Sequence, residues 1–516
     1  MQPSFDIAII GMGPVGTCAA ILFAHNGLNV VTFERDIEVY ALPRAVAMDG
    51  EIVRAFQSIG LGDELNDLLQ TVRPGDRAGF ANSKHEWMFG QNMADSGLNG
   101  WQTLSMFDQP EVESYLRELA IEHPNITCHI GSDVSSFEDL GDQVVLHASN
   151  LASEEALTVS ARYLLGCDGA SSDVRRSLDI SWHDLGYNKD WLVVDIILKE
   201  GHTLTQDTVQ VCDPDRIATF VATKDPYRRW EFKLNPGETW EEMQTPEKIR
   251  DLLDPWTPRG TYEIRRSAVY QFHAATADRW RAGNIFIAGD AAHQTPPFLG
   301  QGMNAGMRDA INLAWKFPMV LSGLADDSLL DSYQQERIPH AQDLVEWAVA
   351  IGQLMEHLAA VELAERQGKP TPDVPPQKKS AGYGQGRGNP PLRDGVIVLD
   401  QVSDTGSSGY LFSQPLVSRD KQTFKLDEAL GKGFAIVAKT DSDLELTEQS
   451  KKIVEKLDIT LTSLETLTEI KGHFDNLFKS SAAAIVRPDR YVFGHTTETV
   501  TLDHLLIELS KKLSLI

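Results

Sequence analysis

A carboxylate followed by a loop rich in proline and glycine lies in the middle of the chain and could bind a polar cofactor. The segment 285–316 reads IFIAGDAAHQTPPFLGQGMNAGMRDAINLAWK. Its apolar start, residues 285–288, is typical of a buried strand. Asp290 follows at the carboxyl end of that strand, which is where open α/β sheets bind their ligands. The spacing therefore predicts a ligand-binding carboxylate at a sheet edge.

The loop after Asp290 is suited to close contact with a flat, electron-rich group. Pro296 and Pro297 would fix its path, and Gly300 and Gly302 would let backbone N–H groups approach a ligand. Helical spacing begins at Asn304, and the first turn of that helix would offer unpaired N–H groups and partial positive charge. The order is strand, carboxylate, glycine loop and helix start.

A second glycine pattern near the start of the chain predicts a nucleotide site. Residues 5–10 (FDIAII) read as an apolar strand, and Gly11, Gly13 and Gly16 then complete G-x-G-x-x-G before an expected helix at 17–26. Glu34 ends the next strand, 18 residues past the last glycine. In this context the glycines allow a pyrophosphate to approach a helix start, and the glutamate accepts from a ribose hydroxyl. NAD and FAD both satisfy this pattern.

A third strand ends in an acid at residues 161–175, ARYLLGCDGASSDVR. Asp168 can brace the following loop by accepting hydrogen bonds, while Ser172 and Arg175 fall on the next helix. Arg175 could pair with a carboxylate or phosphate of a ligand, or form an ion pair within the protein.

Together these motifs resemble those of the FAD-dependent class A aromatic monooxygenases. Residues 289–316 are similar to the GD motif of that family (GDAAHxxPPxxGQGxNxGxxDAxNLAWK), and residues 168–175 resemble its DG motif (DGxxSxVR). Further segments are similar to the branch of 3-(3-hydroxyphenyl)propionate and 3-hydroxycinnamate hydroxylases: WLVVD at 191–195, RRWEF at 228–232, PGET at 236–239 and VRPDRYV at 486–492. The resemblance covers most of the chain and is strongest over 1–345. The chain departs from that branch at 295–299, so the substrate stays open.

The resemblance implies that FAD is the bound cofactor and that NADH or NADPH acts as a transient co-substrate. Gly300, Gln301 and Gly302 would place N–H groups near the flavin ring, and Arg44 matches an arginine that reaches the pyrophosphate or flavin edge. Pro296, Pro297 and Gly300 would form the catalytic wall beside the flavin. No metal site is expected. The expected cofactor-binding residues are Gly11, Gly13, Gly16, Glu34, Arg35, Arg44, Gln109, Asp168, Asp290, Gly300, Gln301, Gly302, Met303 and Asn304.

The implied reaction is hydroxylation of a small phenolic substrate by O₂ through a flavin C4a-hydroperoxide. A 3-(3-hydroxyphenyl)propionate-like acid in aromatic catabolism is the first expectation. The same chemistry on a quinolone, resorcinol or polyketide is the alternative, and so is an NAD(P)H-dependent flavin reductase that inserts no oxygen. An acidic substrate would need a cationic anchor, for which the candidates are Arg228, Arg229, Arg265 and Arg266.

The group that removes the phenol proton is not apparent from the sequence. His273, Tyr270 and Tyr187 are unranked candidates. His293 lies within the GD motif, where a structural role is expected instead.

The predicted fold class is α/β, with three domains. A Rossmann-like FAD-binding domain of the p-hydroxybenzoate hydroxylase type is expected from residues 1–180 and 276–366. Strand-like runs separated by turns predict an antiparallel-sheet substrate domain at 181–275, in which Phe220, Trp230 and Phe232 are expected to be core. A linker rich in Pro and Gly at 367–391 would lead to a thioredoxin-like domain at 392–516, which lacks CxxC.

Composition narrows the classes of partner. With 47 Lys and Arg against 74 Asp and Glu, the net charge of −27 disfavours nucleic acid and anionic membranes. The four cysteines, Cys18, Cys128, Cys167 and Cys212, have no metal or redox spacing, which favours reduced thiols in a cytosolic protein. The N-terminal apolar run is too short for a signal peptide. We expect a cytoplasmic protein without stable membrane association, and a homodimer is one expected assembly.

Overall fold

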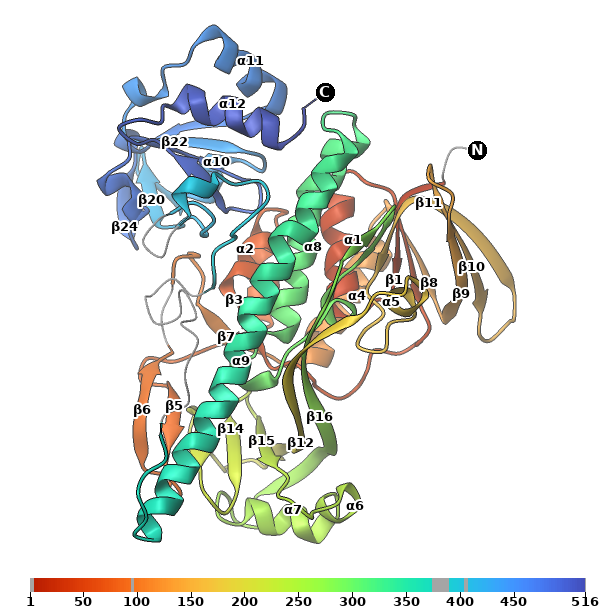
Figure 1. The fold of residues 1–516 in the computed structure, drawn as a ribbon, viewed down its shortest axis with the longest axis vertical. Coiled ribbons are helices and arrows are strands. Elements are labelled where there is room, and N and C mark those ends of the chain that lie inside the picture. Colours follow the sequence, from red (N-terminus) through yellow and green to blue (C-terminus); the bar gives the residue numbers. More distant parts are fainter. Residues whose placement is uncertain (1–3, 94–96, 374–388, 403–406, 516) are drawn as a thin grey trace.

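The computed structural model describes residues 4–93, 97–373, 389–402 and 407–515. Figure 1 shows a parallel sheet flanked by helices, a second sheet below it, and a C-terminal part in blue beside the upper end of the long helices. The four longest helices of the described residues are α1 (Pro14–His25), α4 (Gln109–Glu122), α8 (Gly302–Leu321) and α9 (Asp331–Arg366).

The first sheet has parallel strands at its centre, as the glycine motifs require. Its strand order is β17-β18-β11-β1-β2-β8, with the antiparallel hairpin β9–β10 attached to β11. The parallel pairs are β1–β2, β1–β11, β2–β8 and β11–β18. The strand bounds are β1 Phe5–Ile10, β2 Val30–Glu34, β8 Ile126–Ile130, β9 Ser132–Asp139, β10 Val144–Asn150, β11 Ala156–Gly166, β17 Arg281–Ala282 and β18 Ile285–Ile287. The predicted Rossmann-like α/β domain is confirmed.

Small side chains let the helices pack closely on this sheet. Ala19, Ala20 and Ala24 of α1 are buried, and α1 packs against α8, which begins in the predicted glycine loop. Ala310 and Leu313 of α8 are buried in the same core. The close packing of the two helices brings both glycine loops to one side of the sheet.

The second sheet has the order β19-β16-β12-β15-β14-β13-β5-β6. Phe220, Trp230 and Phe232 are buried on one face, in a core that includes Met243 of α6 (Trp240–Met243) and Ile249 of α7 (Pro246–Leu253), so the expectation that they are core residues is confirmed. The other face meets α9. The strand bounds are β5 Arg77–Ala81, β6 Trp87–Asn92, β12 Trp182–Leu198, β13 Thr208–Cys212, β14 Ile217–Val221, β15 Tyr227–Lys233, β16 Tyr262–Ala277 and β19 His293–Gln294.

Three strands of this sheet, β19, β5 and β6, come from outside the segment 181–275 expected to build it. β5 pairs parallel with β13, and β6 pairs antiparallel with β5. Gly79 and Gly90 face each other across that hairpin, and a Cβ on Gly79 would lie 2.5 Å from the Cα of Gly90. The place of this hairpin in the sheet depends on the pairing of β5 with β13, about 130 residues further on, which no local pattern indicates.

The C-terminal part contains a four-stranded sheet in the order β23-β22-β25-β26. β22 is parallel to β23 and antiparallel to β25, and β25 is antiparallel to β26, as the predicted thioredoxin-like fold requires. Its elements are β22 Ala435–Ala438, α11 Glu448–Leu457, β23 Thr460–Ser463, β25 Ala483–Val486, β26 Val492–His495 and α12 Leu502–Lys512, with a small sheet of β20 Leu416–Arg419, β21 Gln422–Lys425 and β24 Thr468–Lys471. Of the predicted linker, residues 374–388 lie outside the described residues.

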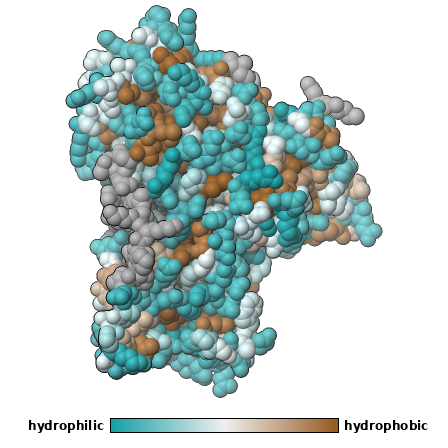
Figure 2. All heavy atoms as spheres, viewed as in Figure 1, coloured by the Kyte–Doolittle hydropathy of each residue, from teal (hydrophilic) through white to brown (hydrophobic). Residues whose placement is uncertain are grey.

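Among the helices of the described residues, the one at 327–366 is long and apolar enough to cross a membrane. It packs against both sheets and carries Glu336 and Arg337 in buried ion pairs, which are features of a core helix. The face of the molecule in Figure 2 is mostly hydrophilic, with scattered apolar patches.

Candidate active site

Four of the predicted ligand-binding positions meet at one edge of the parallel sheet. Ile10 of β1 pairs with Phe33 of β2 and with Gly166 of β11, and Gly166 pairs with Ile287 of β18. Because these strands run in the same direction, the residues that follow them lie side by side. The residues brought together in this way are Gly11, Glu34, Asp168 and Asp290.

The three glycines of the first motif have different structural roles. Gly11 has φ +96°, and an added Cβ would lie 2.5 Å from the carbonyl oxygen of Cys167. A Cβ on Gly16 would lie 2.0 Å from the carbonyl oxygen of Gly11, so this position keeps helix and strand in close contact. Gly13, at the N-cap of α1, has no atom within 4 Å of an added Cβ. The open face at the helix start is suited to a phosphate.

Glu34 lies against this turn. One carboxylate oxygen accepts from the backbone N–H of Met12 at 2.7 Å, and the other accepts from that of Asp36 at 2.8 Å. The guanidinium of Arg35 is 71% exposed and lies 3.9 Å from Asp36. The structure thus brings Glu34 to the predicted site and leaves the Arg35 side chain in solvent.

Asp290 is accessible to a ligand at this edge of the sheet. Its side chain is solvent-accessible, yet desolvation by the surrounding protein raises its pKa, while the charges of His293 and Arg44 act to lower it. An exposed carboxylate that is surrounded by protein atoms has both of these properties, the accessible side chain and the raised pKa. The guanidinium of Arg44 is also exposed and lies 5.0 Å from the ring centre of Tyr40. The two side chains are available to a ligand in the same region.

The proline and glycine loop leads directly into α8. Pro297–Leu299 forms a short 3-10 turn, and Gly300 follows in the left-handed region with φ +63°. An added Cβ on Gly300 would contact that of Ala47 at 3.4 Å, whereas Gly302 has open space beside it. Gly302 and Met303 occupy the first turn of α8, where backbone N–H groups have no partner within the helix. These N–H groups are free to bind a ligand.

The side chains of Gln301 and Asn304 are directed into the protein. Asn304 accepts from the backbone N–H of Asp49 at 3.0 Å and donates to the carbonyl of Gly300 at 2.8 Å. Gln301 donates to the Asp49 carboxylate at 3.1 Å. Both side chains brace the loop, so the cofactor contacts predicted at 300–304 fall to the backbone.

Gln109 and Asp168 also act as braces. The Gln109 side-chain carbonyl accepts from the backbone N–H groups of Arg44 and Ala45, at 2.9 and 2.7 Å. Asp168 accepts from the Ser172 hydroxyl at 2.5 Å and from the backbone N–H of Val174 at 3.0 Å. These bonds fix the segments that carry the exposed groups.

Arg175 and His293 have partners within the protein. Arg175 donates to the carbonyl of Ile180 at 2.8 Å and stacks on Trp182 at 4.5 Å. His293 is buried, and its Nε2 lies 2.9 Å from the Asp309 carboxylate. The arrangement of His293 fits the structural role expected for it. Arg175 is also held within the protein, but by a carbonyl and a ring rather than by the ion pair considered for it.

Paired arginines line the face of the second sheet that is directed toward residues 43–44. Arg229 binds Asp195 at 2.7 Å and donates to the carbonyls of Arg44 and Pro43 at 2.6 and 2.8 Å. Arg266 donates to the carbonyl of Pro43 and lies 3.6 Å from Asp195. These bonds tie the sheet to the segment that carries Arg44.

The other two candidate anchors are also paired. Arg228 binds Asp225 at 2.8 Å, and Arg265 binds Asp108 at 2.7 Å. All four arginines predicted as anchors for a substrate carboxylate therefore have carboxylate partners within the protein.

An aromatic cluster adjoins the proline loop. The Phe298 ring, from the turn after Pro296, lies 5.2 Å from Trp191, 5.8 Å from Tyr187 and 6.3 Å from Phe272. The Tyr187 hydroxyl and the Trp191 indole N–H are buried and interact with each other, but neither forms a hydrogen bond of standard geometry. Unpaired buried polar groups cost free energy and are often matched by a ligand. Burial raises the pKa of Tyr187, which makes it a poor acceptor of a proton.

Glu231 is a candidate site residue that the sequence analysis did not single out. It is 4% exposed on β15 and shares a face of the sheet with Arg229, opposite Trp230 and Phe232. Desolvation raises its pKa to about 7; the charges of Arg229 and Arg266 act to lower it, and that of Asp195 acts to raise it. In the sequence, Glu231 could have been identified by its position between two cationic residues that share its face of the strand. A carboxyl with a raised pKa beside an aromatic cluster is typical of a functional site.

We predict that Glu231→Gln changes the pH dependence of stability. The folded-state pKa lies above the ordinary value of 4.5, so the folded protein loses stability as pH rises between about 4.5 and 7. The variant should match the parent below this interval and exceed it by at most about 3 kcal/mol above it. Urea unfolding at both ends of the interval measures this, with exposed Glu241→Gln as control. A difference that does not depend on pH would contradict the assignment.

Comparison with known proteins finds two matching families and relatives that are similar over nearly the whole chain. The FAD binding domain family matches residues 4–348, and the HcaD C-terminal domain family matches residues 409–512. A 3-(3-hydroxy-phenyl)propionate/3-hydroxycinnamic acid hydroxylase of Klebsiella pneumoniae is 32% identical, over 100% of this chain and 96% of its own. A probable NADH-specific resorcinol 4-hydroxylase of Rhodococcus jostii is 33% identical, over 98% and 95%.

Solved structures share the whole fold. Aklavinone-11 hydroxylase in complex with FAD and aklavinone has a TM-score of 0.81 at 24% identity, covering 99% of both chains. The flavin-dependent monooxygenase PieE in complex with FAD and substrate has a TM-score of 0.78 at 18% identity, covering 99% of this chain and all of its own. The three-part architecture is thus that of known FAD-containing proteins.

Proposed function

The chain belongs to the family of FAD-dependent aromatic hydroxylases, and from this premise we propose that it hydroxylates a phenolic acid similar to 3-(3-hydroxyphenyl)propionate. NADH or NADPH would supply the electrons and O₂ the oxygen atom. The observation that carries the proposal is the aromatic cluster beside the proline loop, where the Tyr187 hydroxyl and Trp191 N–H are buried and neither forms a hydrogen bond of standard geometry. Such a site would bind a flat ring that bears oxygen atoms.

The residues at the sheet edge fit FAD. Gly13 leaves space for a pyrophosphate, Glu34 and Asp290 can accept from hydroxyl groups, and the start of α8 presents backbone N–H groups. FAD, when bound, supplies the redox chemistry between the reduced nicotinamide and O₂. The helix start favours negative charge on a neighbouring ring system.

Side chains of the protein would hold the substrate and accept its phenolic proton. Phe298 and Trp191 would contact the ring and exclude water from it. Glu231 shares the sheet face with Trp191, and its pKa of about 7 suits an acceptor of the phenolic proton. Glu231 joins Tyr270 and His273 as a candidate for this role. His273 is exposed and bonded to Asn188, which makes it a weaker candidate.

A neutral phenol such as resorcinol is the second candidate substrate. The four arginines named as anchors for a substrate carboxylate already have carboxylate partners. Lys233 and Lys189 both pair with Glu356. A neutral ring would need no cation and would leave these pairs intact.

The test is a substrate panel containing 3-(3-hydroxyphenyl)propionate, resorcinol and a quinolone. NADH and NADPH oxidation, O₂ uptake and product mass would be measured for each. Oxidation stimulated by the acid, with a product heavier by one oxygen, is expected. Stimulation by resorcinol alone would favour the second candidate. Oxidation without oxygenated product from any of the three would instead favour a flavin reductase. A cytoplasmic location and a homodimer remain predictions.

A further inference from the structure

We propose that the C-terminal domain positions the loop at 300–304 through Tyr491, which acts on that loop by way of Glu51 and Arg308. Tyr491 is thus a positioning residue for the cofactor. The inference rests on FAD binding at this loop and is independent of which ring is hydroxylated.

The first link joins the two domains. The Tyr491 hydroxyl donates to Glu51 Oε1 at 3.0 Å, and Asn389 donates to Glu51 Oε2 at 3.0 Å. Tyr491 is 5% exposed and Glu51 4% exposed, so solvent does not compete for the bond. Glu51 lies in the first turn of α2 (Gly50–Gln57), directly after the strand β3 (Ala47–Asp49). The Tyr491 hydroxyl, which belongs to the C-terminal domain, therefore forms a hydrogen bond inside the FAD-binding domain.

The second link runs from Glu51 to the loop. Arg308 of α8 donates from Nε to Glu51 at 2.7 Å and from a terminal nitrogen to Gln301 Oε1 at 3.0 Å. Its other terminal nitrogen binds the Asp49 carboxylate. Asp49 in turn accepts from Gln301 and donates its backbone N–H to Asn304. Gln301 and Asn304 bracket the N–H groups of Gly302 and Met303.

The charges of Glu51, Arg308 and Asp49 make the position of the loop depend on the Tyr491 hydroxyl. One guanidinium serves two buried carboxylates, Asp49 and Glu51. Despite desolvation, Arg308 and the Tyr491 hydroxyl hold the pKa of Glu51 below its usual value, while desolvation raises the pKa of Asp49. Without the hydroxyl, Glu51 would depend more on Arg308. Arg308 would then bind Asp49 and Gln301 less strongly.

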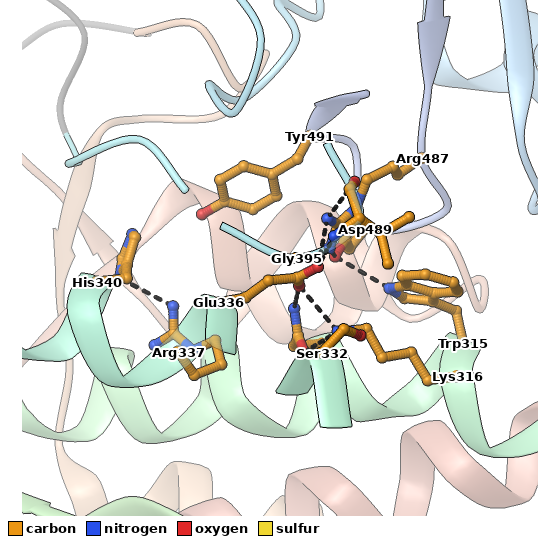
Figure 3. Close-up of polar contacts among 12 residues, drawn as sticks. Trp315, Lys316, Ser332, Glu336, Arg337, His340, Gly395, Arg487, Asp489 and Tyr491 are labelled. Carbon is orange, nitrogen blue, oxygen red and sulfur yellow. Dashed lines mark hydrogen bonds and ion pairs between the residues drawn. The ribbon is translucent and has the colours of Figure 1, made fainter. Parts of the chain in front are cut away.

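A separate ionic cluster keeps Tyr491 in place. Figure 3 shows the Tyr491 side chain directed away from Asp489, which lies on the same segment and binds Trp315. Arg487 of that segment binds Glu336 and also lies 6.0 Å from the centre of the Tyr491 ring. The ring of Tyr491 is therefore free to reach toward the FAD-binding domain while its segment is fixed by ion pairs.

The test is Tyr491→Phe, which removes only the hydroxyl. The matched control is Tyr163→Phe: the buried Tyr163 hydroxyl also donates to a carboxylate, Asp327, at 2.7 Å. Among the described residues, the side-chain partners of Asp327 are Tyr163 and Arg281, neither of which belongs to the loop. FAD release from the holoenzyme, the flavin midpoint potential and the visible flavin spectrum would be measured without aromatic substrate. We expect roughly tenfold weaker FAD retention in Tyr491→Phe, with a shifted potential, and neither change in the control.

A double-mutant cycle tests the route. In a Glu51→Gln background, adding Tyr491→Phe should change FAD retention and potential no further. Unchanged flavin properties in Tyr491→Phe would overturn the proposal, and so would equal changes in Tyr163→Phe. Because no aromatic ring is present in these measurements, their outcome is separate from that of the substrate panel.

Discussion

Gly13→Val is expected to yield a folded protein that does not retain FAD. An added Cβ at Gly13 meets no atom within 4 Å, and its φ of −67° suits any residue, so the backbone at this position accommodates a side chain. The valine methyl groups would occupy the space through which a pyrophosphate approaches the start of α1. We expect FAD affinity to fall by more than about a hundredfold, a change of roughly 3 kcal/mol in binding free energy.

The measurement is flavin absorbance per protein after purification, followed by titration with FAD. Gly433→Val is the matched control, because that glycine lies in the C-terminal part with its nearest outside atom 3.9 Å from an added Cβ. Both variants should keep the circular dichroism of the parent. Full flavin content in Gly13→Val would show that the nucleotide lies elsewhere.

Glu336→Gln is expected to cause the largest loss of stability. The Glu336 carboxylate is fully buried on α9 and accepts from Arg487 at 2.9 Å, from Lys316 at 2.8 Å and from Asn312 at 2.6 Å. Arg487 belongs to the C-terminal domain and Lys316 to α8, so one carboxylate joins three elements (Figure 3). Removing its charge leaves two buried cations with less compensation, which costs roughly 3–5 kcal/mol.

Urea unfolding at neutral pH measures this loss. Burial already lowers the pKa of Lys316 to about 8, against the opposing charge of Glu336, so the variant should release a proton from this lysine at lower pH than the parent. Glu448→Gln is the control, because Glu448 forms an exposed pair with Lys451 and should have no measurable effect. Adding Arg487→Met to Glu336→Gln should cost less than the sum of the single changes. Additive losses would show that the two residues do not act as a pair.

The sequence by itself determined the parallel-sheet domain and the edge at which the cofactor residues meet. Gly11, Glu34, Asp168 and Asp290 each follow an apolar strand within a few residues, and parallel strands carry such residues to one edge. Although the contact of Gly11 with Cys167 depends on the packing of two strands, the close approach of Gly16 to Gly11 also follows from local geometry. These features are readable because the residues that define them are close together in the chain.

Only the tertiary structure decided which polar side chains are available to a ligand and which are paired within the protein. Gln301 and Asn304 fall within the predicted flavin loop, yet their side chains bind Asp49 and the backbone. The candidate anchors Arg229 and Arg266 share Asp195. The pKa of Glu231 is raised mainly by burial, and the charge of Asp195 adds to this effect. Whether a charge is paired depends on neighbours brought in by other strands.

The contact between Tyr491 and Glu51 is the clearest case of this dependence. The two residues are 440 positions apart, and neither belongs to a periodic pattern or motif that points to the other. Strand and helix periodicity records which face of an element is apolar, but it does not record which distant element covers that face. The partner of a buried polar group, and with it the group's pKa and role, is set when the domains pack.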